Sequence, residues 1–272
     1  MPRKFQLTNA NAATYNLNVV GHYFYEPDGL GWGEETTVLR LGQTFLVTQQ
    51  LVEQPIVEGQ IAFHTYEEYE VFLKFVQVGG LILGYMPIST WRYISCTIQL
   101  GKTEIKPTNK MLVCDVTFTG TSQWYERVSI QPSSGEIPDG AKMYNYTYPY
   151  KYARGAVGEI SVVNGPLSSY FRLVMAGLLE NPVWRLYVNG EIKYTGALEV
   201  NIPAGHSLVI NTRPSSMEIS EYDGDGNFYR DLYGYSDFET KRLFALPPGE
   251  STLIVADDNG TPNATLEVYR RV

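Results

Sequence analysis

QPIVEGQIAFHTYEEYEVFLKFVQVGGLILGYMP, residues 54–87, places a helix pattern between two strand patterns. Apolar side chains recur there at three- and four-residue spacings, at Tyr66, Tyr69, Phe72, Leu73 and Val76. This spacing puts them on one face of a helix. Thr65 followed by Glu68 matches a capping box, and Gly79-Gly80 is typical of a helix end. The stretch therefore predicts a helix of about 12 residues.

The segments on either side of this helix alternate as strands do. Ile56–Phe63 precedes it and Leu81–Tyr85 follows it. Further strand patterns cover Lys4–Thr8, Thr36–Leu41, Thr44–Leu51, Trp91–Leu100, Met111–Thr119 and Trp124–Ile130. A helix with one apolar stripe must bury that stripe, and a sheet is the surface available. The first half is therefore predicted to be a small α+β domain, a sheet or split barrel with one helix on it.

The composition is that of a globular chain without a basic surface. Of 272 residues, 44% are hydrophobic and 18% charged, 21 are tyrosine, and the net charge is −8. Residues 1–135 carry 9 basic and 12 acidic residues, and residues 136–272 carry 12 and 17. Neither half has the positive charge expected of a nucleic-acid-binding module.

Targeting and redox signals are few. The start, MPRKFQLTNAN, has no apolar segment of a secretory signal, and no apolar run approaches the roughly 20 residues of a membrane span. We therefore expect synthesis in the cytoplasm and no membrane partner. Cys96 and Cys114 both lie in strand patterns; two buried thiols are favoured, and a cross-strand disulfide stays an alternative.

The remaining segments define the domain organisation. Residues 21–33, GHYFYEPDGLGWG, mix glycine, proline and aromatic residues, which indicates a long loop with contacts. Residues 131–140, QPSSGEIPDG, have the composition of a linker. We predict domains at 1–132 and 158–272 joined by a linker or arm at 133–157. The second domain holds about ten short strand patterns and an Asn189-Gly190 hairpin turn, which predicts an all-β sandwich.

Catalytic and metal-binding patterns are missing from the sequence. Asp223–Asn227 resembles a calcium loop, but Phe228 and Gly234 stand where an EF-hand needs Gly and Glu. The histidines, His22, His64 and His206, lack the spacing of metal ligands, and there is no G-x-S-x-G. Glu67 and Glu68 are better explained by the helix dipole than as a glycosidase pair. We expect no enzyme activity, cofactor or metal.

Two aromatic groups have a structural and a functional interpretation. The first alternates along one face of an extended segment, at Tyr144, Tyr146, Tyr148, Tyr150 and Tyr152. It is either cover for a sheet or a protein contact, and these alternatives weigh equally. The second group, Trp184 and Tyr187 foremost, is either packing or a face for stacking sugars. Packing is favoured for it.

The chain resembles the distal tail proteins of long-tailed phages and prophages along nearly its whole length. The resemblance rests on MPRKFQLTNANAATYNLN, GLGWGEETTVLRLG (29–42), GQIAFHTYEEYEVFLKFV (59–76) and GEISVVNGPLSSYFRLVMAGLLENPVWRLYVNG (158–190). It implies an N-terminal domain that closes a homohexameric ring at the virion tail tip. It also implies a C-terminal domain like a galectin or carbohydrate-binding module.

The resemblance also implies partners. The ring would join the tail tube protein to a tail-tip or fibre protein, pass DNA through its channel, and dock receptor-binding proteins. The expected contacts between subunits or with the hub are Tyr23, Phe24, Tyr25, Trp32, Thr36 and Val38. In the segment 133–157, the residues expected to contact a partner are Tyr144, Tyr146, Tyr148 and Tyr150. A carbohydrate-binding module of a tail adhesion device is the alternative function, and a tail-associated hydrolase has no motif.

Overall fold

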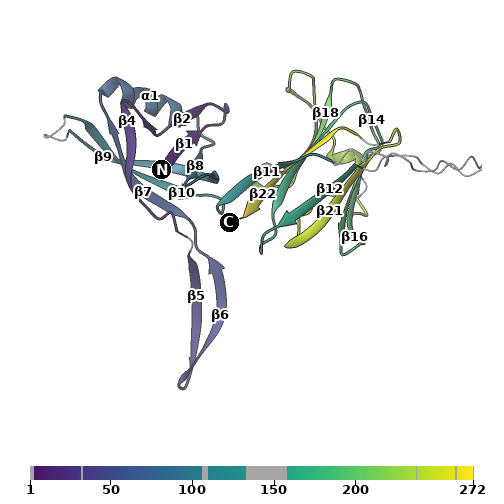
Figure 1. Cartoon of the computed structure of the whole chain (residues 1–272), viewed down its shortest axis with the longest axis horizontal. Helices are drawn as coiled ribbons and strands as arrows, with labels where there is room; N and C mark the ends of the chain where they lie inside the picture. The colour runs from purple at the N-terminus through teal and green to yellow at the C-terminus, as the bar shows by residue number, and fades with distance from the viewer. Residues whose placement is uncertain are drawn as a thin grey trace, which may run out of the picture. The chain divides into compact units, whose positions relative to one another are not determined.

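The computed structural model describes residues 3–31, 33–105, 110–132, 158–236, 238–260 and 262–271, without the side chain of Gln50. The chain divides into two compact units (Figure 1), unit 1 ending at Glu126 and unit 2 covering Arg127–Arg271. Both units are built mainly from antiparallel strands, and the described residues include one α-helix. The predicted fold class, mainly β with an α+β first half, is confirmed.

The described residues of unit 1 form ten complete strands and the helix. They are β1 (Lys4–Thr8), β2 (Thr14–Asn16), β3 (Asn18–Val19), β4 (His22–Asp28), β5 (Glu34–Leu41), β6 (Thr44–Val52), β7 (Ile56–Phe63), α1 (Tyr66–Gln77), β8 (Ile82–Met86), β9 (Arg92–Ile105) and β10 (Leu112–Gly120). One sheet has the order β9-β10-β7-β4-β3, and a second has the order β2-β1-β8-β9. The long strand β9 belongs to both, so the two sheets form one curled layer around a core.

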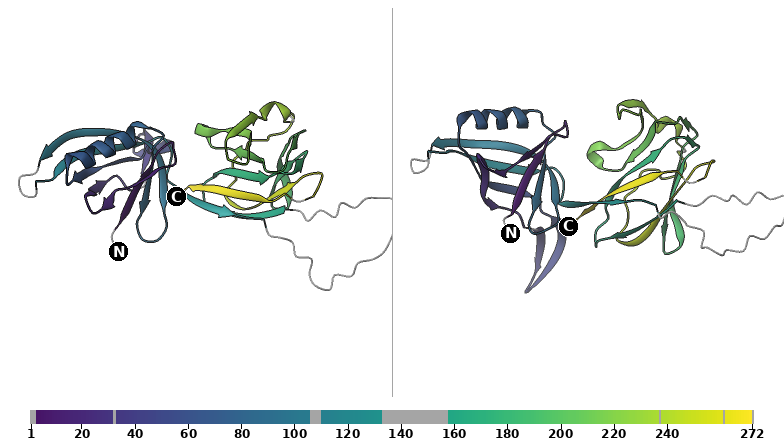
Figure 2. Two further views of the ribbon diagram at one scale, coloured as in Figure 1. Left: turned by 90° about the horizontal axis from the view of Figure 1, so that it is seen from above. Right: turned by 45° about the horizontal axis from the view of Figure 1, so that its top comes forward.

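The helix α1 covers this core as the sequence predicts (Figure 2). The Thr65 hydroxyl accepts from the Glu68 amide at 3.2 Å, and the Glu68 carboxylate accepts from the Thr65 amide at 3.4 Å, which completes the capping box. Phe72 is fully buried, with its ring centroid 5.5 Å from that of Phe63. The buried stripe is narrower than predicted, because Tyr66 at its start is 61% exposed.

The prediction of a long loop at residues 21–33 is wrong for most of its length. His22–Asp28 forms β4, which pairs with β7. The glycine- and proline-rich composition is accommodated by a β-bulge, since the register shifts between Tyr25 and Asp28 and Glu26 has a φ of 51°. Phe24 faces the core on this strand, and that burial favours pairing over a free loop.

Unit 2 is a two-layer sandwich. Its elements are β12 (Gly158–Asn164), β13 (Tyr170–Ala176), β14 (Leu179–Glu180), β15 (Val183–Val188), β16 (Glu191–Ala197), β17 (Asn201–Ile202), β18 (Ser207–Asn211), η1 (Pro214–Ser216), β19 (Glu218–Tyr222), β20 (Phe228–Asp231), η2 (Tyr233–Tyr235), β21 (Gly249–Ala256) and β22 (Ala264–Arg271). One layer runs β20-β19-β18-β13-β22, the other runs β12-β21-β15-β16, and β14 pairs with β17. Asn189 and Gly190, with φ of 53° and 81°, form the predicted hairpin turn between β15 and β16.

The units divide inside one strand, β11 (Tyr125–Ile130), whereas the sequence places the boundary after residue 132. Tyr125 pairs with Tyr93 of β9 in unit 1. Val128 and Ile130 pack against the core of unit 2. Burial of these two side chains therefore extends unit 2 toward the N-terminus, a feature that linker composition does not indicate. The predicted linker segment, residues 133–157, lies outside the described residues.

Two further findings concern the thiols and the membrane. Cys96 and Cys114 are free and buried, as favoured from the sequence, and burial raises the pKa of Cys96 to about 12. The described part of the chain contains no helix with the length and apolar character needed to cross a membrane.

Candidate assembly surface

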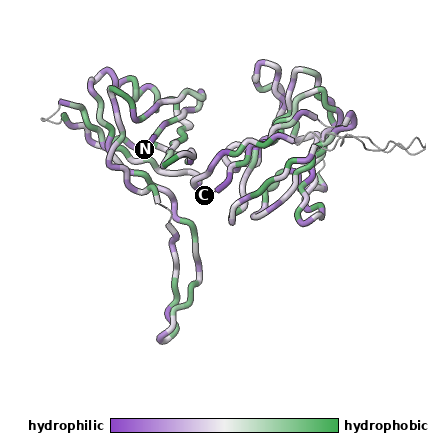
Figure 3. The backbone as a smooth tube through the Cα atoms, in the orientation of Figure 1, coloured by the Kyte–Doolittle hydropathy of each residue, from purple (hydrophilic) through white to green (hydrophobic). Residues whose placement is uncertain are grey.

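The hairpin of β5 and β6, which we call the arm, extends from the rest of unit 1 (Figure 1). Every residue of β5 is exposed, and so are the residues of β6 whose side chains are described, up to Leu51. Large apolar side chains more than half exposed occur along it, at Val38, Leu39, Leu41, Phe45, Leu46, Val47 and Leu51. In Figure 3 the backbone tube of the arm is coloured hydrophobic over parts of both strands. Contiguous apolar exposure of this kind marks an interaction site.

Both faces of the arm are apolar. The register pairs Val38 with Val47 on one face and Leu39 with Leu46 on the other. The arm is a two-stranded sheet of its own, so the outer edge of each strand lacks a ladder partner among the described strands. A lone two-stranded hairpin is marginally stable in water. The arm therefore leaves apolar side chains and strand edges that its own unit does not cover.

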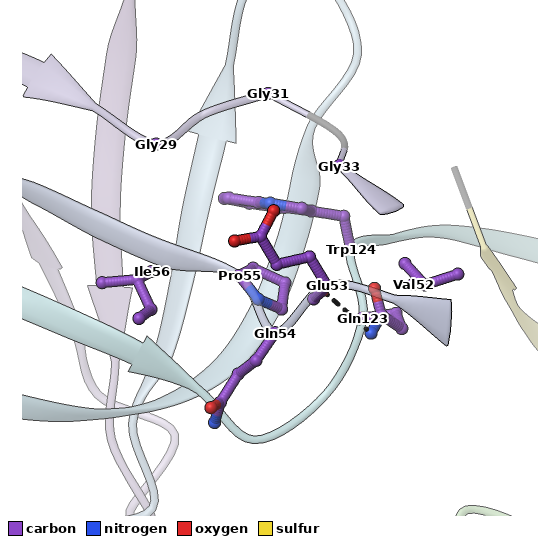
Figure 4. A pocket seen from close by; sticks show the side chains of 10 residues that line it. All are labelled: Gly29, Gly31, Gly33, Val52, Glu53, Gln54, Pro55, Ile56, Gln123 and Trp124. Carbon is purple, nitrogen blue, oxygen red and sulfur yellow. Dashed lines mark hydrogen bonds between the residues drawn. The ribbon is translucent and has the colours of Figure 1, made fainter. Parts of the chain in front are cut away.

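A pocket of about 260 Å³ lies at the base of the arm. It is lined by Gly29, Gly31, Gly33, Val52, Glu53, Gln54, Pro55, Ile56, Gln123 and Trp124. Figure 4 shows the side chains of Glu53 and Trp124 in this pocket, with Gly29, Gly31 and Gly33 along one side of it. A Cβ added at Gly33 would lie 2.4 Å from Glu53 Oε2, so glycine is what allows this close approach.

The polar groups of the pocket are unevenly satisfied. Gln54 Nε2 donates to the Gly120 carbonyl at 2.8 Å, and Gln123 Nε2 donates to the Glu53 carbonyl at 3.5 Å. Trp124 is 8% exposed, and its Nε1 has no hydrogen-bond partner among the described residues. Buried donors are nearly always bonded, so an unmet one calls for an explanation. The lining of the pocket thus combines a buried indole N–H without a partner among the described residues and the carboxylate-bearing Glu53.

The predicted contact residues fall into three groups. Thr36 and Val38 are exposed on the arm, with Val38 at 52%. Tyr23 and Tyr25 lie on the outer face of β4 with ring centroids 5.4 Å apart, and the Tyr25 hydroxyl donates to Gln60 Oε1 at 2.6 Å. Phe24 is 3% exposed, so its prediction as a surface contact is wrong for this chain by itself.

Some predicted residues lie outside the described part of the chain, and some described residues were not predicted. Trp32 and the tyrosines Tyr144, Tyr146, Tyr148 and Tyr150 lie outside the described residues. Sequence reasoning missed Phe45, Leu46 and Val47, and also Trp124. The signal for the first three was available, because a run of adjacent apolar residues cannot hide all of them on one face of a strand.

The main residue of the predicted sugar-stacking face in unit 2 is not on the surface. Trp184 is fully buried, and its Nε1 donates to the Arg242 carbonyl at 3.0 Å. It faces the core because alternate residues of β15 point inward. Tyr187 is half-buried and lines a groove of about 600 Å³ over β12, β15 and β21.

Charged groups in unit 2 serve its own packing. The fully buried Glu221 accepts from Arg230 Nε at 2.7 Å and lies 2.6 Å from His206 Nδ1. The Asp223 carboxylate accepts from the amides of Asn227 and Asp225, which lowers its pKa and closes the β19–β20 turn. No set of three or more metal-ligating side chains gathers among the residues that the structure describes.

Comparison with known proteins points to phage tails. Residues 4–121 match the N-terminal domain of distal tail proteins. The fold is similar to a chain of the phage P2 baseplate in its activated conformation with calcium, with a TM-score of 0.71, 16% identity and coverage of 100% of this chain and 99% of that one. It is also similar to the Dit protein of phage SPP1, a hub of the adsorption apparatus, with a TM-score of 0.58, 8% identity and coverage of 97% and 98%. No curated protein sequence matches the chain.

Proposed function

We propose that this chain, whose residues 4–121 match the N-terminal domain of distal tail proteins, assembles with copies of itself into a ring of six at the tip of a phage tail. The observation that carries the proposal is the arm, whose apolar side chains are exposed on both faces. A monomer in water gains nothing from such an arm, whereas neighbouring copies in an assembly can cover it.

Closed rings place one surface of a subunit against a different surface of the next. The arm supplies one such surface, and the outer face of β4 with Tyr23 and Tyr25 supplies another candidate within unit 1. The ring would join the tail tube protein to the tail-tip or fibre protein and leave a channel for DNA. Unit 2 and the segment 133–157 would serve as the docking platform for receptor-binding proteins. The chain acts in this proposal as a structural part of the virion rather than as an enzyme.

The alternative, a carbohydrate-binding module, has weaker support. Its proposed stacking residue Trp184 is inside the sandwich core, and a buried ring cannot present its face to a sugar. Tyr187 on the groove remains a candidate contact. A glycan array probed with the whole chain tests this alternative, and binding lost in Tyr187→Ala would favour it.

Native mass spectrometry of the purified chain tests the ring. We expect a species of six times 30.7 kDa, and a ring in electron micrographs. The double variant Phe45→Ser/Leu46→Ser, which makes the arm polar, should shift the population toward monomer. The matched control is Val71→Ser/Ile88→Ser, at exposed apolar sites outside the arm, and it should leave the assembly intact. A chain that stays monomeric at every concentration and salt condition would contradict the proposal.

A further inference from the structure

We propose that the tip of the arm of one copy docks into the pocket at the base of the arm of the next copy. The tip is defined here as residues 40–44, and the pocket is the one lined by Glu53 and Trp124. This inference rests on the proposed self-assembly and names the two surfaces that would meet in it.

The pocket has the chemistry of a site for a polar turn rather than for a cofactor. Its 260 Å³ falls below the roughly 300–1,000 Å³ of small-molecule sites, so it suits side chains of a protein segment. The indole N–H of Trp124, nine-tenths buried and without a described partner, requires an acceptor. The adjacent Glu53 carboxylate accepts hydrogen bonds and attracts a cation.

The tip of the arm offers the complementary groups. Gln43 is exposed, and its amide carries both a carbonyl acceptor and N–H donors. Arg40 is exposed and uses its Nε to donate to the Gly42 carbonyl at 3.0 Å, which holds the guanidinium against the turn. A turn carrying an amide and a guanidinium therefore matches a pocket carrying an indole N–H and a carboxylate.

The charged residues of the arm are also divided between its tip and its base. Arg40 near the tip is the only basic residue of β5 and β6, whereas Glu34, Glu35 and Glu53 lie at or beside the base. Opposite charges at the two ends favour head-to-tail contact between copies, which is the heterologous arrangement that closes a ring.

The length and continuous pairing of the arm favour a second copy of the chain as the partner. A strand of eight residues spans about 26 Å, at about 3.3 Å per residue. The strands stay paired along the arm from Glu34–Val52 to Leu41–Thr44, so the tip cannot fold back onto its own base. An arm of that length reaches the pocket of an adjacent copy instead.

A charge-swap experiment on the full chain tests this docking. We expect Arg40→Glu and Glu53→Arg each to weaken self-association at least tenfold in sedimentation velocity. The double variant should restore it to within about threefold of wild type. The control Glu70→Arg, on the exposed face of α1, should have no effect. Single variants that associate like wild type, or a double variant no better than either single one, would overturn the docking.

A second variant separates docking from folding. Trp124→Phe keeps an aromatic ring and removes the indole N–H, so it should weaken self-association while the melting temperature of the monomer stays the same or rises. An unchanged association constant would overturn the role of Trp124. A wild-type chain that does not self-associate would instead overturn the proposed ring, which distinguishes the two failures.

Discussion

Two hairpins of this chain share a backbone pattern and differ in what they bury. In the β15–β16 hairpin, Trp184 and Leu186 are fully buried in the sandwich core, and β15 also pairs with β21. In the arm, β5 and β6 pair with each other and with no other described strand, and Leu39 and Leu46 are both 51% exposed. Both hairpins have complete cross-strand registers apart from one irregularity each.

The difference shows that strand pairing and burial are separate contributions. Hydrogen bonds between strands replace bonds to water and contribute little net free energy, whereas removing apolar area from water stabilises a fold directly. The β15–β16 hairpin is therefore held by its own unit. The arm has apolar area that its own unit leaves in water, so we expect its stability to depend on association.

The largest change in unfolding free energy is expected for the buried β15–β16 hairpin. Trp184→Ala should lower the free energy of unfolding of unit 2 by about 3–5 kcal/mol, because it empties the centre of the core. Chemical denaturation followed by circular dichroism measures it. Gly196→Ala is a companion variant, since a Cβ there would lie 2.1 Å from the Trp184 ring. An unfolding curve like that of wild type would break the comparison.

A smaller effect is expected at the start of α1. Thr65→Ala removes the hydroxyl that accepts from the Glu68 amide, and it should cost about 1 kcal/mol of unit 1 stability. Thr65→Ser keeps the hydroxyl and should retain most of that stability. Thermal melts of the three proteins measure the difference. If serine and alanine destabilise equally, the cap does not contribute as the structure indicates.

The smallest effect is expected on the arm. Leu39→Ala should change the unfolding free energy of the monomer by no more than about 0.5 kcal/mol, because its side chain is half exposed. The matched variant is Leu83→Ala in the buried core of unit 1, which should cost about 2–5 kcal/mol. Both are measured in dilute solution. A loss of several kcal/mol at Leu39 would mean that the arm packs within its own unit.

Local sequence patterns predicted the elements whose signals are local. The helix over Tyr66–Gln77 follows from apolar spacing and the capping box, and the Asn189-Gly190 turn follows from the need for positive φ. The composition of residues 21–33 predicts a loop because four glycines and a proline stand in that stretch, yet β4 itself contains the proline and no glycine. Pairing with β7 and burial of Phe24 outweigh that composition, and the β7 partners lie 30 or more positions along the chain.

By itself, the sequence determined which segments are strands and helix in most of the chain, and its resemblance to distal tail proteins agrees with the match of residues 4–121. Only the tertiary structure decided which apolar side chains are used for folding. Trp184 and Phe45 both lie in strand patterns, yet the first is buried and the second is 65% exposed. Hydropathy along a chain is the same for a core strand and a contact strand, because the distinction depends on whether another layer of the same unit covers it.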